Sequence, residues 1–125
     1  MTVHLDHVIV PSRSQAKSAK LLAELLGVPW SKSALGGFSP VYVNDGLTLD
    51  FQGTDEAFPV YHFCFRVVQK EFDAILGRIQ AKGIKYRSQV FGAADMKVDK
   101  QYGNFYWNEP DGHFWEILTQ SYART

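Results

Sequence analysis

The chain repeats one pattern twice, and this duplication restricts its fold more than any other feature of the sequence. In each half, an apolar segment that contains a histidine is followed by apolar residues at helical spacing that end at a glycine. His7 precedes Gly27 by 20 residues, and His62 precedes Gly83 by 21. A unit of about 55 residues cannot bury both faces of its own sheet. We therefore expect two similar modules that bury their sheets together.

Each half also ends on a segment that contains a carboxylate. Asp50 lies 23 residues after Gly27, whereas Glu116 lies 33 residues after Gly83. The additional length of the second half falls in residues 87–101, which combine glycine, alanine and several charged residues. Such a mixture without apolar periodicity predicts mostly a loop.

Apolar alternation and turn residues predict a strand, a helix and two further strands in the first half. We expect Pro11 to end the first strand, Ser12 and Gln15 to form a capping box, and Gly27 to end the helix. The Asn44-Asp45-Gly46 segment predicts a hairpin turn, because these residues tolerate positive φ. The predicted strands cover residues 5–10, 38–44 and 47–52.

The second half repeats this order, with a helical stripe from Phe72 to Ile79 that ends at Gly83. Its predicted strands cover residues 60–67, 102–108 and 113–119. These segments predict one α+β domain over residues 1–125, with module one at 1–57 and module two at 58–125.

Composition excludes several classes of protein. The chain has 125 residues, of which 46% are hydrophobic and 21% charged, the balance of a globular protein. Thirteen basic residues balance thirteen acidic ones, which argues against a general nucleic-acid binder. Cys64 is the single cysteine, so no disulfide can form within the chain. Because the sequence shows neither a signal peptide nor a membrane span, we expect a cytoplasmic protein without a membrane partner.

Strand alternation predicts which side chains share a face. Between residues 61 and 67, His62, Cys64 and Arg66 alternate with apolar or aromatic residues. In the last strand, Glu116 shares a face with Phe114 and Leu118. Two histidines and one or two carboxylates that reach one pocket would bind a divalent metal ion. The alternation alone also fits histidines with a structural or surface role. The aromatic residues of opposite parity are expected in the core: Phe63, Phe65, Trp107 and Trp115.

Further polar side chains are candidates for substrate contacts. Arg66 could bind a substrate carboxylate, or lie at the exposed end of its strand. Asn104 and Tyr106 have the same parity and are expected to contact substrate. Cys64 could act as a ligand or nucleophile, but a lone cysteine in a strand is more often a small buried filler. His113 belongs to a turn motif and is expected to be structural.

Three segments resemble the vicinal oxygen chelate superfamily, which includes glyoxalase I, bleomycin-resistance proteins, fosfomycin-resistance thiol transferases and extradiol dioxygenases. They are Leu-Asp-His-Val-Ile-Val, Tyr-His-Phe-Cys-Phe-Arg-Val and Phe-Tyr-Trp-Asn-Glu-Pro-Asp-Gly-His-Phe-Trp-Glu, at residues 5–10, 61–67 and 105–116. The last segment is the most specific. The resemblance implies two βαβββ modules that form a curved mixed sheet around a cleft.

The resemblance also implies a site and a chemistry. It places His7, His62 and Glu116 at the positions of the metal ligands, for one Ni, Zn, Mn or Fe ion. Asp50 occupies the place of a fourth ligand in glyoxalase I, but it is shorter than the glutamate there. It could instead accept a hydrogen bond beside the ligands. Members of this superfamily bind a small substrate through two neighbouring oxygens and stabilise an enolate or alkoxide.

The resemblance leaves several activities open. We prefer a lyase or isomerase of the glyoxalase I type, with Asp50 or Glu116 transferring a proton, over a dioxygenase in which Tyr106 acts as acid or base. A fosfomycin-type transferase is less favoured. The alternative to an enzyme is a metal-free binding protein of the bleomycin-resistance type, which would stack an aromatic drug. The resemblance also implies a homodimer.

Overall fold

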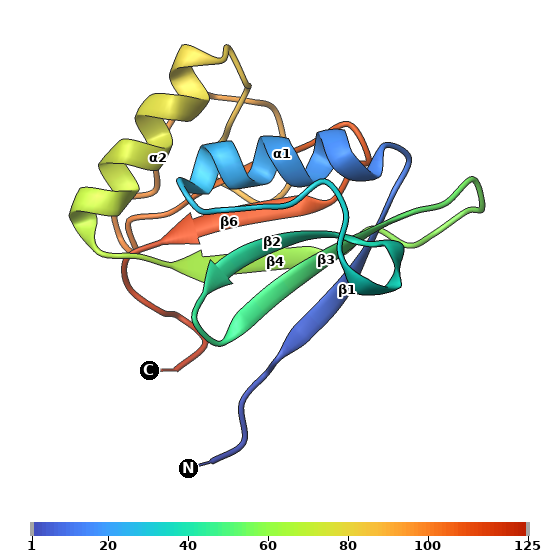
Figure 1. Cartoon of the computed structure of the whole chain (residues 1–125). Helices are drawn as coiled ribbons and strands as arrows, with labels where there is room; N and C mark the ends of the chain where they lie inside the picture. Colours follow the sequence, from blue (N-terminus) through green and yellow to red (C-terminus); the bar gives the residue numbers. More distant parts are fainter. Residues whose placement is uncertain (1, 125) are drawn as a thin grey trace. The chain divides into compact units, whose positions relative to one another are not determined.

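In the computed structural model, which describes residues 2–124, the chain forms two compact units whose boundary falls between Phe58 and Pro59. Both units contain a three-stranded mixed sheet and one longer α-helix (Figure 1). This α+β arrangement confirms the expected fold class. No helix in the described part of the chain is long and apolar enough to cross a membrane.

The N-terminal unit contains β1 (His7–Ser12), α1 (Gln15–Leu26), a short 3-10 helix (Leu35–Gly37), β2 (Ser39–Asn44) and β3 (Leu47–Gly53). Its strand order is β1-β3-β2, with β1 parallel and β2 antiparallel to β3. The apolar face of α1 packs on this sheet. The buried apolar residues of this unit are Ala19, Leu22, Ala23 and Leu25 on the helix, and Val10, Val41, Leu49 and Phe51 on the strands.

The C-terminal unit contains β4 (His62–Arg66), α2 (Gln69–Ala81), β5 (Phe105–Asn108) and β6 (Phe114–Leu118). Its strand order, β4-β6-β5, repeats that of the first unit. Phe72 of α2 meets Phe105 of β5 edge to face, with 5.3 Å between ring centroids. Trp107 and Trp115 are buried, as expected from parity, whereas Phe63 and Phe65 are half-buried and stack on Trp115.

The fourth strand of a βαβββ module is reduced to a single antiparallel bridge in each unit. Trp30 pairs with Val41 of β2, and Arg87 pairs with Tyr106 of β5. Each bridge extends its sheet beyond the last full strand. The two units therefore keep the expected order of elements, with three strands long enough to form ladders.

The start of α1 differs from the predicted capping box. Ser12 is the last residue of β1 rather than a helix cap, and Ser14 precedes the helix without a side-chain cap. The Ser12 hydroxyl accepts a hydrogen bond from the Ser14 N–H at 3.0 Å. Pro11 does not end β1, because β1 is an edge strand and proline is tolerated there. Gly27 ends the helix in the left-handed conformation, at φ 73°, as predicted.

Residues 87–101 contain no helix or full strand, as predicted. The Asp95 carboxylate organises part of this loop, because it accepts hydrogen bonds from the Ser88 hydroxyl at 2.6 Å and from the backbone N–H groups of Ser88 and Lys97 at 3.0 Å. The bond from the Ser88 hydroxyl is the main cause that lowers the pKa of Asp95.

Candidate functional site

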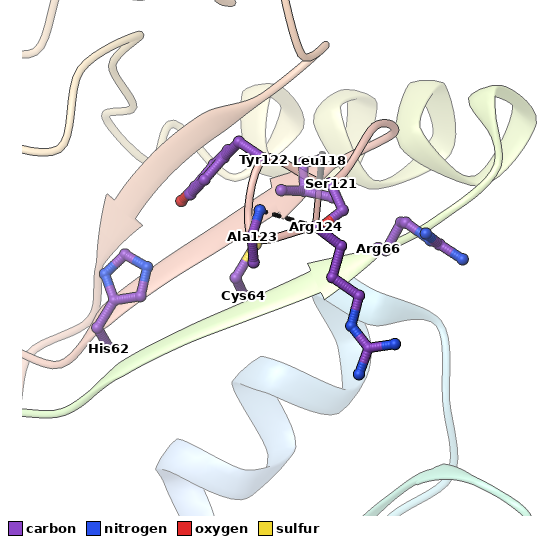
Figure 2. A pocket seen from close by; sticks show the side chains of 8 residues that line it. All are labelled: His62, Cys64, Arg66, Leu118, Ser121, Tyr122, Ala123 and Arg124. Carbon is purple, nitrogen blue, oxygen red and sulfur yellow. Dashed lines mark hydrogen bonds between the residues drawn. The ribbon is translucent and has the colours of Figure 1, made fainter.

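The exposed face of β4 lines a cavity of about 490 Å³ in the C-terminal unit. His62, Cys64 and Arg66 all point to this face, since side chains alternate along a strand. The other walls come from Leu118 of β6 and from the C-terminal segment, as Figure 2 shows: Ser121, Tyr122, Ala123 and Arg124. The alternation read from the sequence thus correctly predicted which β4 side chains lie together.

Glu116 of β6 lies next to this cavity, with its carboxylate fully buried. Oε1 lies 2.9 Å from Nε2 of His62 and accepts a hydrogen bond from the Tyr122 hydroxyl at 2.7 Å. Oε2 accepts a hydrogen bond from Nδ2 of Asn104 at 2.9 Å. A buried carboxylate needs such partners, because losing water without replacing its hydrogen bonds is costly.

Asn104 and Tyr106, expected to contact substrate, lie behind the carboxylate. Both are buried, and Nδ2 of Asn104 also lies 3.3 Å from the Tyr106 hydroxyl. Neither residue belongs to the described lining of the cavity. Burial raises the pKa of Tyr106, so the phenol stays protonated at neutral pH. In this structure Asn104 therefore orients Glu116.

Cys64 is exposed, so it is not the buried filler expected of a lone cysteine. Partial desolvation of its thiol, with a smaller contribution from the Glu116 charge, raises the pKa of Cys64 to about 12. Reactive cysteines have a lowered pKa, because the thiolate is the nucleophile and the metal ligand. Cys64 is therefore suited to a neutral wall position.

His7 and Asp50 belong to the N-terminal unit. His7 pairs with Thr48 and Ile9 pairs with Asp50 in the parallel ladder, so His7 and Asp50 share one face of the sheet. Nδ1 of His7 lies 2.8 Å from Oδ2 of Asp6, and this contact raises the pKa of the exposed histidine. The sequence interpretation did not predict that Asp6 contacts the His7 imidazole, although the two residues are adjacent in the sequence.

The donor set of the C-terminal unit fits a divalent metal ion. Two ligands about 2.1 Å from one ion and at right angles to each other are about 3.0 Å apart. The 2.9 Å between His62 Nε2 and Glu116 Oε1 matches this separation. Neither unit by itself, over residues 2–124, gathers three or more His, Cys, Asp or Glu side chains at metal-binding spacing. The structure thus brings two of the three proposed ligands together, and His7 belongs to the other unit.

Tyr122 was not identified from the sequence. It follows the last strand, in a segment without periodicity. Its hydroxyl donates to Glu116, and burial together with this bond raises the pKa of Tyr122. A lone tyrosine after the final strand carries no pattern that would connect it with a glutamate six residues earlier.

Glu109 and His113 organise the turn before β6. His113 is buried, and its Nδ1 accepts the Tyr61 backbone N–H at 3.0 Å, which is the structural role expected of it. Oε1 of Glu109 accepts the His113 backbone N–H at 2.8 Å. Burial raises the pKa of Glu109 from 4.5 to about 7.

The Glu109→Gln variant is expected to be more stable than wild type in alkaline buffer. A carboxyl whose pKa is raised by folding binds its proton more tightly in the folded state. Stability is therefore lost as the pH rises from 4.5 through about 7. Glutamine removes this loss and can still accept the His113 N–H. The melting temperature should rise by a few degrees at about pH 8 and by much less at about pH 5. Glu56→Gln, at an exposed position, is the control, and an equal gain at both pH values would contradict the assignment.

Comparison with known proteins gives clear structural relatives. No family model and no curated protein matches the chain. The protein named Oxidase ChaP-H1 is 34% identical, with a TM-score of 0.89, and the match covers 97% of this chain and 98% of that one. Oxidase ChaP-H2 is 33% identical, with a TM-score of 0.80, over 98% and 97% of the two chains. The E126Q mutant of the fosfomycin resistance protein FosX from Listeria monocytogenes, complexed with Mn(II) and 1S,2S-dihydroxypropylphosphonic acid, is 17% identical. Its TM-score is 0.72, over 98% and 96% of the two chains.

The fold and the site define a small α+β protein with two related modules and a buried glutamate paired with a histidine. The chain belongs to the vicinal oxygen chelate superfamily. This confirms the resemblance seen in the three sequence segments.

Proposed function

We propose that the chain is a divalent-metal-dependent oxidase that binds a small organic substrate through two adjacent oxygen atoms. The observation that carries this proposal is the pairing of His62 with the buried Glu116, at 2.9 Å, beside a cavity large enough for a substrate. The identity of 34% and 33% with two proteins named oxidases supports oxidation over the isomerase reaction that the sequence favoured.

Three residues would hold the metal ion: His62 through Nε2, Glu116 through Oε1, and His7. Imidazole and carboxylate donors suit Mn, Fe, Ni and Zn, and the Mn(II) in the FosX complex is consistent with a divalent ion. When bound, the ion would supply a Lewis acid that stabilises negative charge on the substrate oxygens.

The surrounding residues prepare the two donors. Asn104 holds Oε2 of Glu116 and so keeps Oε1 directed at His62. The Tyr122 hydroxyl, in the same unit, donates a hydrogen bond to Oε1. Tyr106, protonated because its pKa is raised, can donate a hydrogen bond but is a poor base at neutral pH. Asp50, on the same face as His7, is the proposed proton acceptor of the N-terminal unit.

A metal-free binding protein is supported less well. A drug-binding cavity that works by stacking needs aromatic walls. Among the described residues that line the cavity, Tyr122 and the His62 imidazole provide the rings. The remaining lining residues are aliphatic, small or charged, so they offer little stacking surface.

The test is oxygen uptake by the full chain after loading with Fe²⁺ or Mn²⁺ under anaerobic conditions. Catechol and dihydroxynaphthalene carry adjacent oxygens and serve as probes. We expect uptake that requires both metal and probe and that is lost in His62→Ala. Isomerisation of a hemithioacetal without oxygen uptake would instead establish the lyase. Binding of the probes without metal or turnover would establish the binding protein.

We also propose that the active form is a homodimer, in which His7 reaches the ion from the same chain or from a second copy. Mixing the inactive His7→Ala and His62→Ala variants under exchange conditions separates these cases. Activity should return only if one site takes ligands from two chains, because a mixed dimer then contains one intact site. A monomer mass in light scattering would contradict the dimer.

A further inference from the structure

We propose that the substrate carries an anionic group, which Arg66 and Arg124 bind at the end of the cavity remote from His62. This inference rests on the proposed function, since it names the substrate class of the same cavity. The substrate would then be an elongated organic acid, with two adjacent oxygens at one end and a carboxylate at the other.

Among the residues that the structure describes, the guanidinium groups of Arg66 and Arg124 have no partner. Both Arg66 and Arg124 line the cavity, and neither forms an ion pair or a hydrogen bond with another residue among 2–124. Other arginines of the chain are engaged. Arg13 donates to the carbonyls of Thr54 and Glu56, and Arg87 donates to the carbonyl of Val90. Both side chains are exposed, so a carboxylate that enters the cavity can reach their planar sets of donors.

The spacing along β4 defines the length of the ligand. His62 and Arg66 are four residues apart on one straight strand, so their Cα atoms are about 13 Å apart. In Figure 2, Cys64 lies between His62 and Arg66 along the strand. A three-carbon oxoaldehyde is too short to reach both ends, whereas two or three fused rings are long enough. The cavity of about 490 Å³ can hold a ligand of this size.

Part of the cavity wall is suited to the apolar body of such a ligand. Leu118 pairs with Arg66 in the β4–β6 ladder, so it lies toward the Arg66 end, and Ala123 also lines the cavity. Cys64 lies between His62 and Arg66 on the same face of β4 and also lines the cavity. The cavity therefore has the His62 imidazole at one end, and an apolar wall with two guanidinium groups toward the other.

The experiment compares a dihydroxynaphthoic acid with its methyl ester. In the acid, the adjacent hydroxyls and the carboxyl lie on different rings. Binding to the full chain is measured by calorimetry without metal and after loading with Mn²⁺. We expect the acid to bind at least about tenfold more tightly than the ester. Arg66→Gln and Arg124→Gln should each remove most of this preference, because they weaken binding of the acid far more than binding of the ester. Lys70→Gln, an exposed charge change on α2, is the matched control.

Three outcomes would overturn the inference: equal affinity for acid and ester, an acid preference that survives in both arginine variants, or binding of neither probe. Circular dichroism melting of each variant excludes loss of fold as the cause. The proposed function fails separately. An acid preference that depends on the arginines, without metal-dependent oxygen uptake, would keep this inference and reject the oxidase. Metal-dependent oxygen uptake together with equal affinity for acid and ester would keep the oxidase and reject this inference.

Discussion

The Glu116→Gln variant is expected to lower the affinity for Mn²⁺ or Fe²⁺ by about 100-fold or more, and with it the metal-dependent activity. The carboxylate is the charged member of the proposed ligand set, and its Oε1 lies 2.9 Å from His62 Nε2. Glutamine has the same shape but is a weak, neutral ligand. Calorimetric titration with each metal measures this change directly.

The same substitution should leave the fold intact. The amide oxygen of glutamine can accept from Asn104 Nδ2, where Glu116 Oε2 now accepts at 2.9 Å. Its NH₂ group can donate to His62 Nε2 and to the Tyr122 oxygen. Because the glutamine amide keeps partners in Asn104, His62 and Tyr122, the melting temperature is expected to change by only a few degrees.

Tyr122→Phe provides the matched comparison for Glu116→Gln. It removes the hydroxyl that donates to Glu116 at 2.7 Å but leaves the ligand in place. Metal affinity should therefore fall by only about tenfold, clearly less than in Glu116→Gln. If Glu116→Gln bound metal as tightly as wild type, Glu116 would not be a ligand, and the proposed metal site would be wrong.

The successful part of the sequence interpretation depended on regular structure. His62, Cys64 and Arg66 share one face because β-strands have a period of two, which is readable from sequence. Parity also predicted that Glu116 and Trp115 point to opposite faces of their strand. The structure confirms that Trp115 lies in the core against Phe63. The duplicated order of elements predicted the α+β fold for the same reason, because periodicity and turn residues are local signals.

The parts that were missed depend on long-range or irregular contacts. Tyr122 reaches Glu116 from a segment that is neither helix nor strand. Asn104 has the parity of Tyr106, but its amide turns to Glu116 rather than to the cavity. Pro11 was read as the end of a strand, yet the position of β1 at the sheet edge accommodates it. Each outcome is decided by which elements become neighbours, and local pattern does not encode that.

Trp115 carries the second large prediction, because it is the centre of the aromatic core of the C-terminal unit. It is 1% exposed, and the rings of Phe63 and Phe65 stack on it at centroid distances of 4.9 and 6.1 Å. His113 meets it edge to face at 6.3 Å. Trp115 is also the neighbour of Glu116 in β6, so its packing holds the strand that presents the proposed ligand.

The Trp115→Ala variant is expected to lose about 3–5 kcal/mol of unfolding free energy, because it removes buried surface and leaves a cavity. Against a total of about 5–15 kcal/mol for an ordinary domain, this loss would leave the C-terminal unit marginal. Urea unfolding followed by circular dichroism measures it. Phe91→Ala, which truncates a ring that is 76% exposed, should cost less than about 1 kcal/mol. A comparable loss in both variants would mean that Trp115 does not anchor the core, and that the position of Glu116 is maintained by its hydrogen bonds to Asn104 and Tyr122.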